Sequence, residues 1–507
     1  DSGSAFTVSA ADASADLAIG DGGIAAAKAA DYRISAPVRI LADQTWELES
    51  VSGCKLTISG PLNAGQSPYT ITIAGGGRID VSGGGDFAGS VNIQGGSVVL
   101  YGRDAFGSGE GTISVQERAV SLSGTTVAKD FFFDCGTTWS SKARIGVWAG
   151  NSAIRGKVSF SDQNFTICPY MNSCVMFEGG VEGPGWPCLR EGSGGRIVFT
   201  ETPVSFRHGL GAIGDGTPDA AGFAYYIDFS VADNVLPSLG TEGWPLKNAY
   251  VRTTVDRTFG ATGTALYLAS GVVLDLCGTE QNFGNLTATV GTGHLPVITS
   301  TSTNPAKLHL NQAKASTPSV IFAGNLSVDF VGPVMTTIDR AMTATGEVIV
   351  TSGTLAFTAD GSWTTATRLS VADGASVSLA RADTFGRGME VSLVGDGRLQ
   401  IAAGVTQTVS LLTVDGVSLP RAEYQMGEGT LNVLYSGRHD AVDGTLTVEA
   451  GEKVTIGEDF ICDPFDTIVL GDNAELDLRT AAFLPDGAEV TLAVGQGAAL
   501  TLAEGLD

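Results

Sequence analysis

The chain has 507 residues, of which 43% are hydrophobic and 69 are glycine, so it holds enough apolar material for a large core. Its 54 acidic and 29 basic residues give a net charge of −25, which repels nucleic-acid phosphates and anionic lipids. We therefore expect no nucleic-acid partner, and since no run of about 18 apolar residues occurs, no membrane insertion.

The first regular pattern lies between residues 91 and 122, where apolar and polar residues alternate as in a strand with one buried face. Four apolar positions recur 22 residues later: Val91, Ile93, Val98 and Leu100 map onto Ile113, Val115, Val120 and Leu122. Because a 22-residue unit cannot bury its own apolar face, we expect such units to stack as coils, with parallel strands about 4.8 Å apart. Small turn residues would let neighbouring coils approach.

From about residue 128 to 335 the 22-residue period fades, and 19 of the 38 aromatic residues lie between Phe131 and Phe259. We expect wider coils here, with long excursions packed on the flank. Flat aromatic rings pack on sugars and are enriched in binding patches. The sequence therefore predicts a contact surface for a host or environmental glycan or protein, formed by Trp139, Trp148, Trp186, Tyr225, Tyr226 and Trp244.

Three of the seven cysteines, Cys168, Cys174 and Cys188, lie close together in a stretch rich in Pro and Gly. In an exported protein they offer a disulfide, either Cys168–Cys174 or Cys174–Cys188. Buried, unpaired thiols are the alternative. We expect no cofactor. The excess of acidic residues either keeps the protein soluble or, as the alternative, includes turn carboxylates that bind Ca²⁺.

The 22-residue period returns after residue 336 and continues to the end of the chain. It predicts three sections: a solenoid over 1–127, an irregular aromatic-rich solenoid over 128–335, and a regular solenoid over 336–507. The fold class is therefore all-β, a right-handed parallel β-helix (β-solenoid) with about 22-residue coils and an irregular, loop-rich middle. The C-terminal stacks predicted are Val448, Leu470 and Leu492; Ile456, Leu478 and Leu500; Leu446, Ile468 and Val490; and, in the turns, Gly451, Asn473 and Gly495.

Two segments that are far apart along the chain match in sequence: 95–109 reads GGSVVLYGRDAFGSG and 374–388 reads GASVSLARADTFGRG. Each is followed by a strand, a turn and another strand. This pattern resembles the autotransporter-associated β-strand repeat, over about 91–124, 352–424 and, more loosely, 441–507. The resemblance implies an extracellular or cell-surface bacterial protein with an elongated β-helix and no catalytic residues to carry over.

Two non-catalytic functions fit this interpretation: an adhesive stalk, or a fibre subunit that stacks end to end with copies of itself. The last coil, Val490 to Leu502, has an apolar ladder without a cap, so we expect more chain beyond Asp507 or association with residues near Asp1 to Ile19 of another copy. We expect that the protein is not an enzyme. The alternative is a polysaccharide-active β-helix enzyme, a lyase or glycoside hydrolase, whose candidate residues are Asp130, Asp134, Asp228 and Arg252.

Overall fold

The computed structural model describes residues 6–12, 14–63, 68–136, 143–190, 194–213, 217–260, 263–289, 293–479 and 489–502. Every regular element within these residues is a β-strand, and the fold is a parallel β-solenoid. The chain divides into two compact units. Unit 1 comprises Asp1–Asn311 and Pro318–Asn325, and unit 2 comprises Gln312–Thr317 and Leu326–Asp507.

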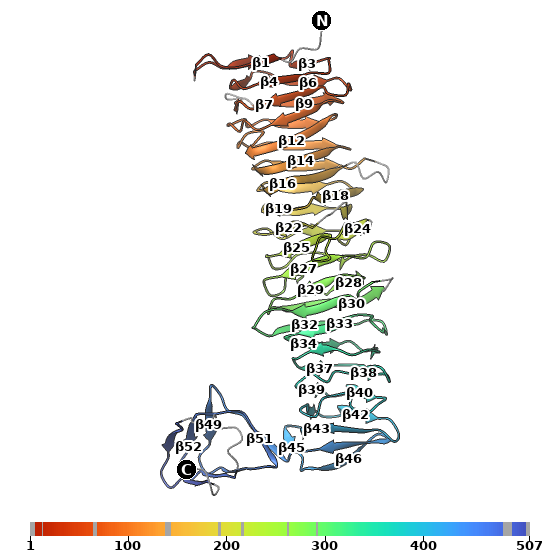
Figure 1. Cartoon of the computed structure of the whole chain (residues 1–507), viewed down its shortest axis with the longest axis vertical. Coiled ribbons are helices and arrows are strands. Elements are labelled where there is room, and N and C mark those ends of the chain that lie inside the picture. The colour runs from red at the N-terminus through yellow and green to blue at the C-terminus, as the bar shows by residue number, and fades with distance from the viewer. Residues whose placement is uncertain are drawn as a thin grey trace. The chain divides into compact units, whose positions relative to one another are not determined.

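One sheet runs through most of unit 1, and we call it the long sheet. Its strands come from successive coils and pair in parallel, as β12, β14 and β16 show (Figure 1). In unit 1 it contains β1 (Phe6–Val8), β4 (Asp31–Ile34), β7 (Lys55–Ile58), β10 (Arg78–Val81), β12 (Ser97–Arg103), β14 (Ala119–Val127), β16 (Arg144–Ile154), β18 (Asn164–Pro169), β19 (Ser173–Phe177), β21 (Trp186–Arg190), β22 (Gly195–Phe199), β24 (Gly211–Ile213), β25 (Tyr225–Phe229), β27 (Ala249–Thr253), β29 (Val273–Asp275), β31 (Val297–Ser300) and β33 (Ile321–Gly324).

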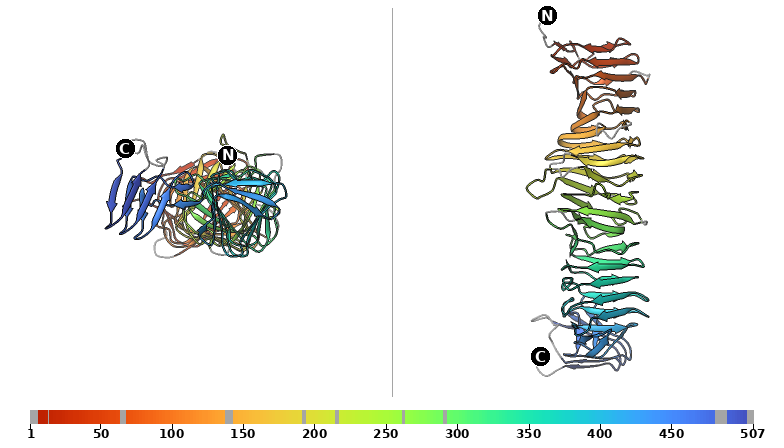
Figure 2. Two further views of the ribbon diagram at one scale, coloured as in Figure 1. Left: turned by 90° about the horizontal axis from the view of Figure 1, so that it is seen from below. Right: turned by 90° about the vertical axis from the view of Figure 1, so that its right-hand side faces the viewer.

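The other walls of unit 1 are shorter sheets that stack in the same way (Figure 2, right). The N-terminal sheet contains β3 (Ile24–Ala26), β6 (Gln44–Leu48), β9 (Thr70–Gly75), β11 (Ser90–Ile93), β13 (Thr112–Gln116), β15 (Asp130–Asp134), β17 (Val158–Phe160), β20 (Val181–Gly183) and β23 (Ser205–Phe206). Beside it are β2 (Leu17–Ile19), β5 (Val38–Ile40) and β8 (Leu62–Asn63). The later coils add β26 (Ser238–Leu239), β28 (Thr264–Ala269), β30 (Glu280–Thr289) and β32 (Ala306–Asn311).

Unit 2 begins with the same architecture and ends with a separate small stack. Its coils contain β34 (Leu326–Val331), β35 (Met335–Ile338), β36 (Thr343–Ala344), β37 (Val348–Val350), β38 (Thr354–Phe357), β39 (Arg368–Val371), β40 (Ser376–Leu379), β41 (Glu390–Leu393), β42 (Arg398–Ile401), β43 (Thr406–Val409), β44 (Leu411–Val414), β45 (Val417–Ser418), β46 (Ala422–Met426) and β47 (Gly429–Val433). Two antiparallel hairpins, β44–β45 and β46–β47, interrupt the parallel pattern. The small stack contains β48 (Gly437–His439), β49 (Thr445–Val448), β50 (Lys453–Ile456), β51 (Phe460–Cys462), β52 (Thr467–Leu470), β53 (Glu475–Leu478), β54 (Thr491–Val494) and β55 (Ala499–Leu502), around an apolar core of its own.

The 22-residue register is confirmed in all three regions where the sequence showed it. Val91 lies opposite Ile113 and Val98 opposite Val120 in unit 1. In unit 2, the four apolar side chains of β39 and β40 lie opposite those of β41 and β42. Leu446 pairs with Ile468, Val448 with Leu470 and Ile456 with Leu478.

The predicted register is wrong for the last coil. Ile468 lies opposite Leu492 and Leu470 opposite Val494, so each partner comes two positions later than the predicted one. Similarly, Leu478 lies opposite Leu502. The connection before β54 is longer by the same amount, and an even shift keeps the same side chains on the inner face because strand side chains alternate.

The two matching segments have the same local structure. Asp104 and Asp383 both adopt positive φ, of 51° and 53°. Two residues later, Phe106 and Phe385 are both buried in the core. The two matching segments therefore form the same turn, which places a phenylalanine side chain in the core.

A stack of phenylalanines fills the interior of the middle coils of unit 1. Phe177, Phe199 and Phe229 lie in register on β19, β22 and β25, with ring centroids 5.5 and 5.0 Å apart. The stack continues through Phe259 to Phe283, at 5.0 and 5.2 Å. Where the short period fades, aromatic stacking thus takes over the packing between coils.

A buried lysine ties together one corner of unit 1. Lys129 is 2% exposed, and its ammonium lies within hydrogen-bond distance of four backbone carbonyls on the two preceding coils, which share its three N–H donors. The acceptors are the oxygens of Phe87 (2.8 Å), Gly89 (3.0 Å), Gly109 (3.0 Å) and Glu110 (2.9 Å). Burial lowers the pKa of Lys129 to about 8.

Close approach of coils requires glycine at some corners, and Gly75 gives a direct test. Its φ is +82°, and a Cβ there would lie 1.8 Å from the carbonyl oxygen of Leu48. Gly260 has a similar φ of +71° with open space around it. We expect Gly260→Ala to cost about 1–2 kcal/mol of unfolding free energy for the left-handed conformation alone. Gly75→Ala should cost about 1–3 kcal/mol more, because the coils must separate. Equal shifts of the two urea midpoints would contradict this account.

Candidate functional site

The outer side of the long sheet carries a first cluster, formed by Lys55, Arg78, Asp80, Tyr101 and Trp148. Since Ile79 and Val81 fill the core, Asp80 faces outward by alternation, yet it is only 5% exposed. The Nε of Arg78 donates to Asp80 at 2.7 Å, and the Nζ of Lys55 lies 2.8 Å from the same carboxylate. Arg78 also donates to the hydroxyl of Tyr101 at 3.0 Å. The carboxylate thus fixes two cations at the surface.

Trp148 completes the first cluster because a bulge re-aims its side chain. The register of β14 and β16 shifts between Leu122 and Ser123, whose partners are Val147 and Ala149, so Trp148 is the extra residue. Trp148 is 46% exposed, and the guanidinium of Arg78 lies 5.5 Å from its ring centroid. An aromatic face and a cation are therefore presented together.

A second cluster lies further along the same sheet, around Asp228 on β25. Asp228 is 4% exposed and lies opposite Arg252, whose Nε and Nη2 donate to its two oxygens at 3.1 and 3.3 Å. The Nε of Arg196 lies 3.6 Å from the same carboxylate. The guanidinium of Arg196 is also 5.9 Å from the ring centroid of Tyr226. The second cluster repeats the combination of buried aspartate, arginine and aromatic ring.

Tyr226 and Tyr250 extend the second cluster as a pair in register on β25 and β27. Their ring centroids are 6.0 Å apart, and Phe223 packs edge-on against both rings. The hydroxyl of Tyr226 donates to Asp219 at 2.8 Å, and that of Tyr250 donates to Asp275 at 2.6 Å. Both rings are thus held in place by their hydroxyl groups.

Asp275 is the most enclosed carboxylate of the second cluster, with 1% exposure. It accepts hydrogen bonds from the hydroxyls of Tyr250 and Thr301, each at 2.6 Å, and from the backbone N–H groups of Cys277 and Thr301 at 3.0 and 3.1 Å. Burial alone would raise the pKa of Asp275, but these donors outweigh it and the pKa lies below its ordinary value. Burial and the Asp275 carboxylate raise the pKa of Tyr250.

The donor pattern around Asp275 differs from that of a glycosidase acid. A glycosidase pair needs one carboxyl group that stays protonated near neutral pH, through a raised pKa. The pKa of Asp275 is lowered instead. What faces solvent is a row of aromatic faces and guanidinium N–H groups, which suits ligand binding.

The predicted aromatic platform is only partly assembled. Trp148 belongs to the first cluster and Tyr226 to the second, whereas Tyr225 is fully buried and cannot be part of a surface. Trp186 stacks on His208, with centroids 4.0 Å apart. Trp244 is partly buried in a turn, where its backbone N–H donates to Thr241 at 3.0 Å. Trp139 lies outside the described residues.

The four predicted enzyme residues fall on two different sheets. Asp228 and Arg252 meet in the second cluster. Asp130 and Asp134 lie on β15 of the N-terminal sheet, where they accept backbone N–H groups from Lys157 and Gly136. Sequence reasoning missed Arg78, Arg196, Tyr250 and Asp275. A signal was present for Tyr250, which follows Tyr226 by one coil, just as Arg252 follows Asp228.

Neither predicted disulfide is formed in the structure. The three cysteines lie on β18, β19 and β21, and both predicted pairings include Cys174, which is a free thiol. The Sγ of Cys188 donates to the carbonyl of Trp186 at 3.4 Å, and burial raises the pKa of Cys188 to about 12. The alternative of buried thiols describes Cys188.

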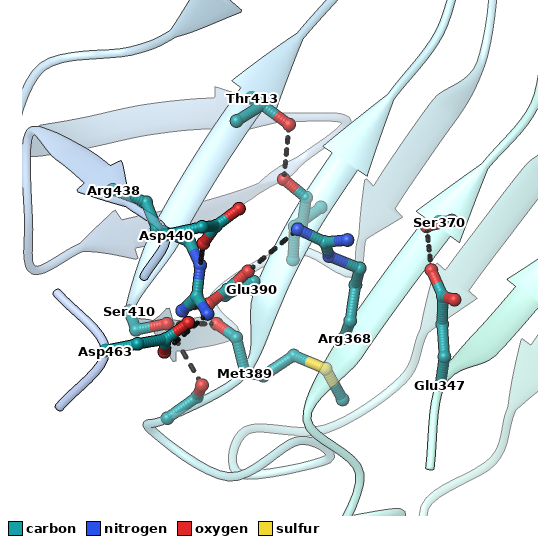
Figure 3. Close-up of polar contacts among 12 residues, drawn as sticks. Glu347, Arg368, Ser370, Met389, Glu390, Ser410, Thr413, Arg438, Asp440 and Asp463 are labelled. Carbon is teal, nitrogen blue, oxygen red and sulfur yellow. Dashed lines mark hydrogen bonds and ion pairs between the residues drawn. The ribbon is translucent and has the colours of Figure 1, made fainter. Parts of the chain in front are cut away.

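A cleft of about 760 Å³ in unit 2 gathers further charged side chains (Figure 3). Arg438 on β48 donates to Glu390 and Asp440, and at 2.8 Å to Asp463. Glu390 on β41 also accepts from Arg368 at 3.2 Å. Both arginines are thus engaged by carboxylates, so this cleft is an ion-pair junction between β41 and β48.

Across the described ranges, no group of three or more His, Cys, Asp or Glu side chains is placed to hold a metal ion. A helix long and apolar enough to cross a membrane is likewise absent from the described part of the chain. No family model, curated protein or solved structure matches this chain.

Proposed function

We propose that this protein is an extracellular structural and adhesive β-solenoid of a bacterial surface, a stalk that binds glycans through the two clusters on its wall, and that it is not an enzyme. The observation that carries the proposal is the pairing of a solvent-facing aromatic ring with a guanidinium group, Trp148 with Arg78 and Tyr226 with Arg196. Aromatic faces pack against the C–H faces of sugars, and arginine donates to their oxygens. The resemblance to surface-protein repeats supports the location.

An array of immobilised neutral and uronate-containing oligosaccharides tests this proposal. We expect the full chain to bind, and Trp148→Ala and Tyr226→Ala each to weaken binding about tenfold, as expected for an aromatic anchor. Phe6→Ala is the matched control, because Phe6 is an exposed aromatic residue (51%) of the same sheet and lies outside both clusters. Absence of binding, or equal binding by all three variants, would overturn the proposal.

A fibre subunit is the second candidate, favoured by the surface of the small stack in unit 2. Among the described residues, β54 and β55 pair with β52 and β53 on one side only. Their apolar side chains Leu492, Val494 and Leu502 are 46%, 53% and 50% exposed. Such strands can pair with a strand of a second copy. Long filaments in negative-stain images would favour this function over the stalk, and separate particles would favour the stalk.

A further inference from the structure

A groove crosses four neighbouring strands of the N-terminal sheet, on a different wall from the two clusters. Strands β9, β11, β13 and β15 pair in parallel, with Ile71, Val91, Ile113 and Phe131 in register and buried in the core. The alternate residues face outward and line a cavity of about 300 Å³. Asn92, Ser114 and Phe132 form one column across the floor of this groove, with Gln116 and Asp134 beside it.

Asn92 lines the groove with its side-chain amide. The Oδ1 of this amide is buried and has no hydrogen-bond partner among the described residues. An amide group can both donate a hydrogen bond to a hydroxyl group and accept one from it. The groove thus contains a polar group that suits a ligand rich in hydroxyl groups.

Phe132 presents an apolar face in the same groove. Its neighbours Phe131 and Phe133 are 1% and 0% exposed, whereas Phe132 is 40% exposed because it points to the outer side. It stands in register with Ser114 on the preceding coil. The ring of Phe132 therefore lies in one column with the hydroxyl of Ser114 and the amide of Asn92, so an apolar face and hydrogen-bonding groups lie side by side.

The charge of the lining selects the ligand. Among the described residues, the lining side chains are hydroxyl, amide and apolar groups with one carboxylate, Asp134, and no lysine or arginine. An anion would be repelled by Asp134 and by the net charge of −25. A neutral molecule with many hydroxyl groups and an apolar face fits both the amide of Asn92 and the exposed ring of Phe132.

We propose that this groove binds a neutral oligosaccharide, with one hydroxyl group hydrogen-bonded to the side-chain amide of Asn92 and one sugar ring packed on Phe132. The site goes beyond the two clusters, because it lies on another sheet and lacks their arginines. A volume of about 300 Å³ is at the small end of ligand sites and holds one or two sugar rings.

Isothermal titration of the full chain with cellohexaose, laminarihexaose, maltohexaose and an oligogalacturonate of equal length tests the proposal. We expect at least one neutral hexasaccharide to bind, with affinity reduced about tenfold in Asn92→Ala and in Phe132→Ala. Thr45→Ala is the matched control, since Thr45 is an exposed outward residue of β6, in register with Thr72 one coil away. Its affinity should equal that of the unmodified chain.

Comparison with Trp148→Ala separates this site from the two clusters. One class of binding sites for the neutral hexasaccharide should persist in Trp148→Ala and be lost in Phe132→Ala, whatever the clusters themselves bind. The inference is overturned if none of the neutral hexasaccharides binds, or if their binding falls in Trp148→Ala and persists in Phe132→Ala. Phe132 is exposed, so its variant should fold, and circular dichroism verifies this for each variant.

Discussion

Replacing Phe229 with alanine should lower the unfolding free energy of unit 1 by about 3–5 kcal/mol, the usual cost of removing a buried phenylalanine. Phe229 is fully buried, and its ring lies 5.0 Å from both Phe199 and Phe259, so the substitution breaks the stack on both sides. Because each coil of a solenoid is stabilised by its neighbours, the loss should also spread to β22 and β27. Urea unfolding, followed by hydrogen exchange in peptides from these strands, measures both effects.

Phe132→Ala is the control for this prediction. The same chemical change at an exposed position should alter stability by no more than about 0.5 kcal/mol. A loss below about 1 kcal/mol for Phe229→Ala would contradict the role given to the stack. Hydrogen-exchange protection of β22 and β27 that stays at the level of the unmodified chain would also contradict this role.

Replacing Lys129 with methionine should destabilise unit 1 by at least about 3 kcal/mol at pH 7. Methionine is one atom shorter and uncharged, so it leaves four carbonyl oxygens without the ammonium that they share. Hydrogen bonds to a charged group contribute about 1.5–3 kcal/mol each. Lys157→Met is the control, because Lys157 is half exposed and its ion pair with Glu182 lies at the surface. That variant should lose less than about 1 kcal/mol.

The difference in stability between the unmodified chain and Lys129→Met should depend on pH. The folded-state pKa of about 8 lies below the ordinary value of 10.5, so between these values the unfolded chain binds more protons than the folded chain. Stability relative to the variant should therefore be constant below pH 8 and rise above it, by up to about 1.4 kcal/mol per pH unit. Thermal unfolding of both proteins from pH 6 to 10 checks the sign. A difference that falls with rising pH would contradict the burial of the ammonium.

Alternation and period were sufficient to predict the coils, because both depend only on which face of a strand is buried. The prediction of the aromatic surface did not take this alternation into account. In the run from Tyr225 to Phe229, Tyr225 shares its phase with Ile227 and Phe229, so it points inward, and Tyr226 points out. Applying this rule would have removed Tyr225 from the predicted surface.

The first cluster was beyond such reasoning because its members come from coils of unequal length. Arg78 and Trp148 lie on strands of different coils and meet only because a bulge in β16 turns the indole toward the guanidinium. Neither the bulge nor the coil lengths between them follow from a periodic pattern. The antiparallel hairpins of unit 2 were missed for a related reason, since strands of either direction alternate in the same way.

The lengthened connection before β54 indicates how such a scaffold can acquire new surface features. A connection between strands can grow by two residues and still place apolar side chains opposite apolar side chains, as Leu492 and Val494 opposite Ile468 and Leu470 show. An odd insertion within a strand would instead exchange the two faces beyond it. Evolution, or a protein engineer, can therefore graft loops at the corners while leaving the hydrogen-bonded ladder intact.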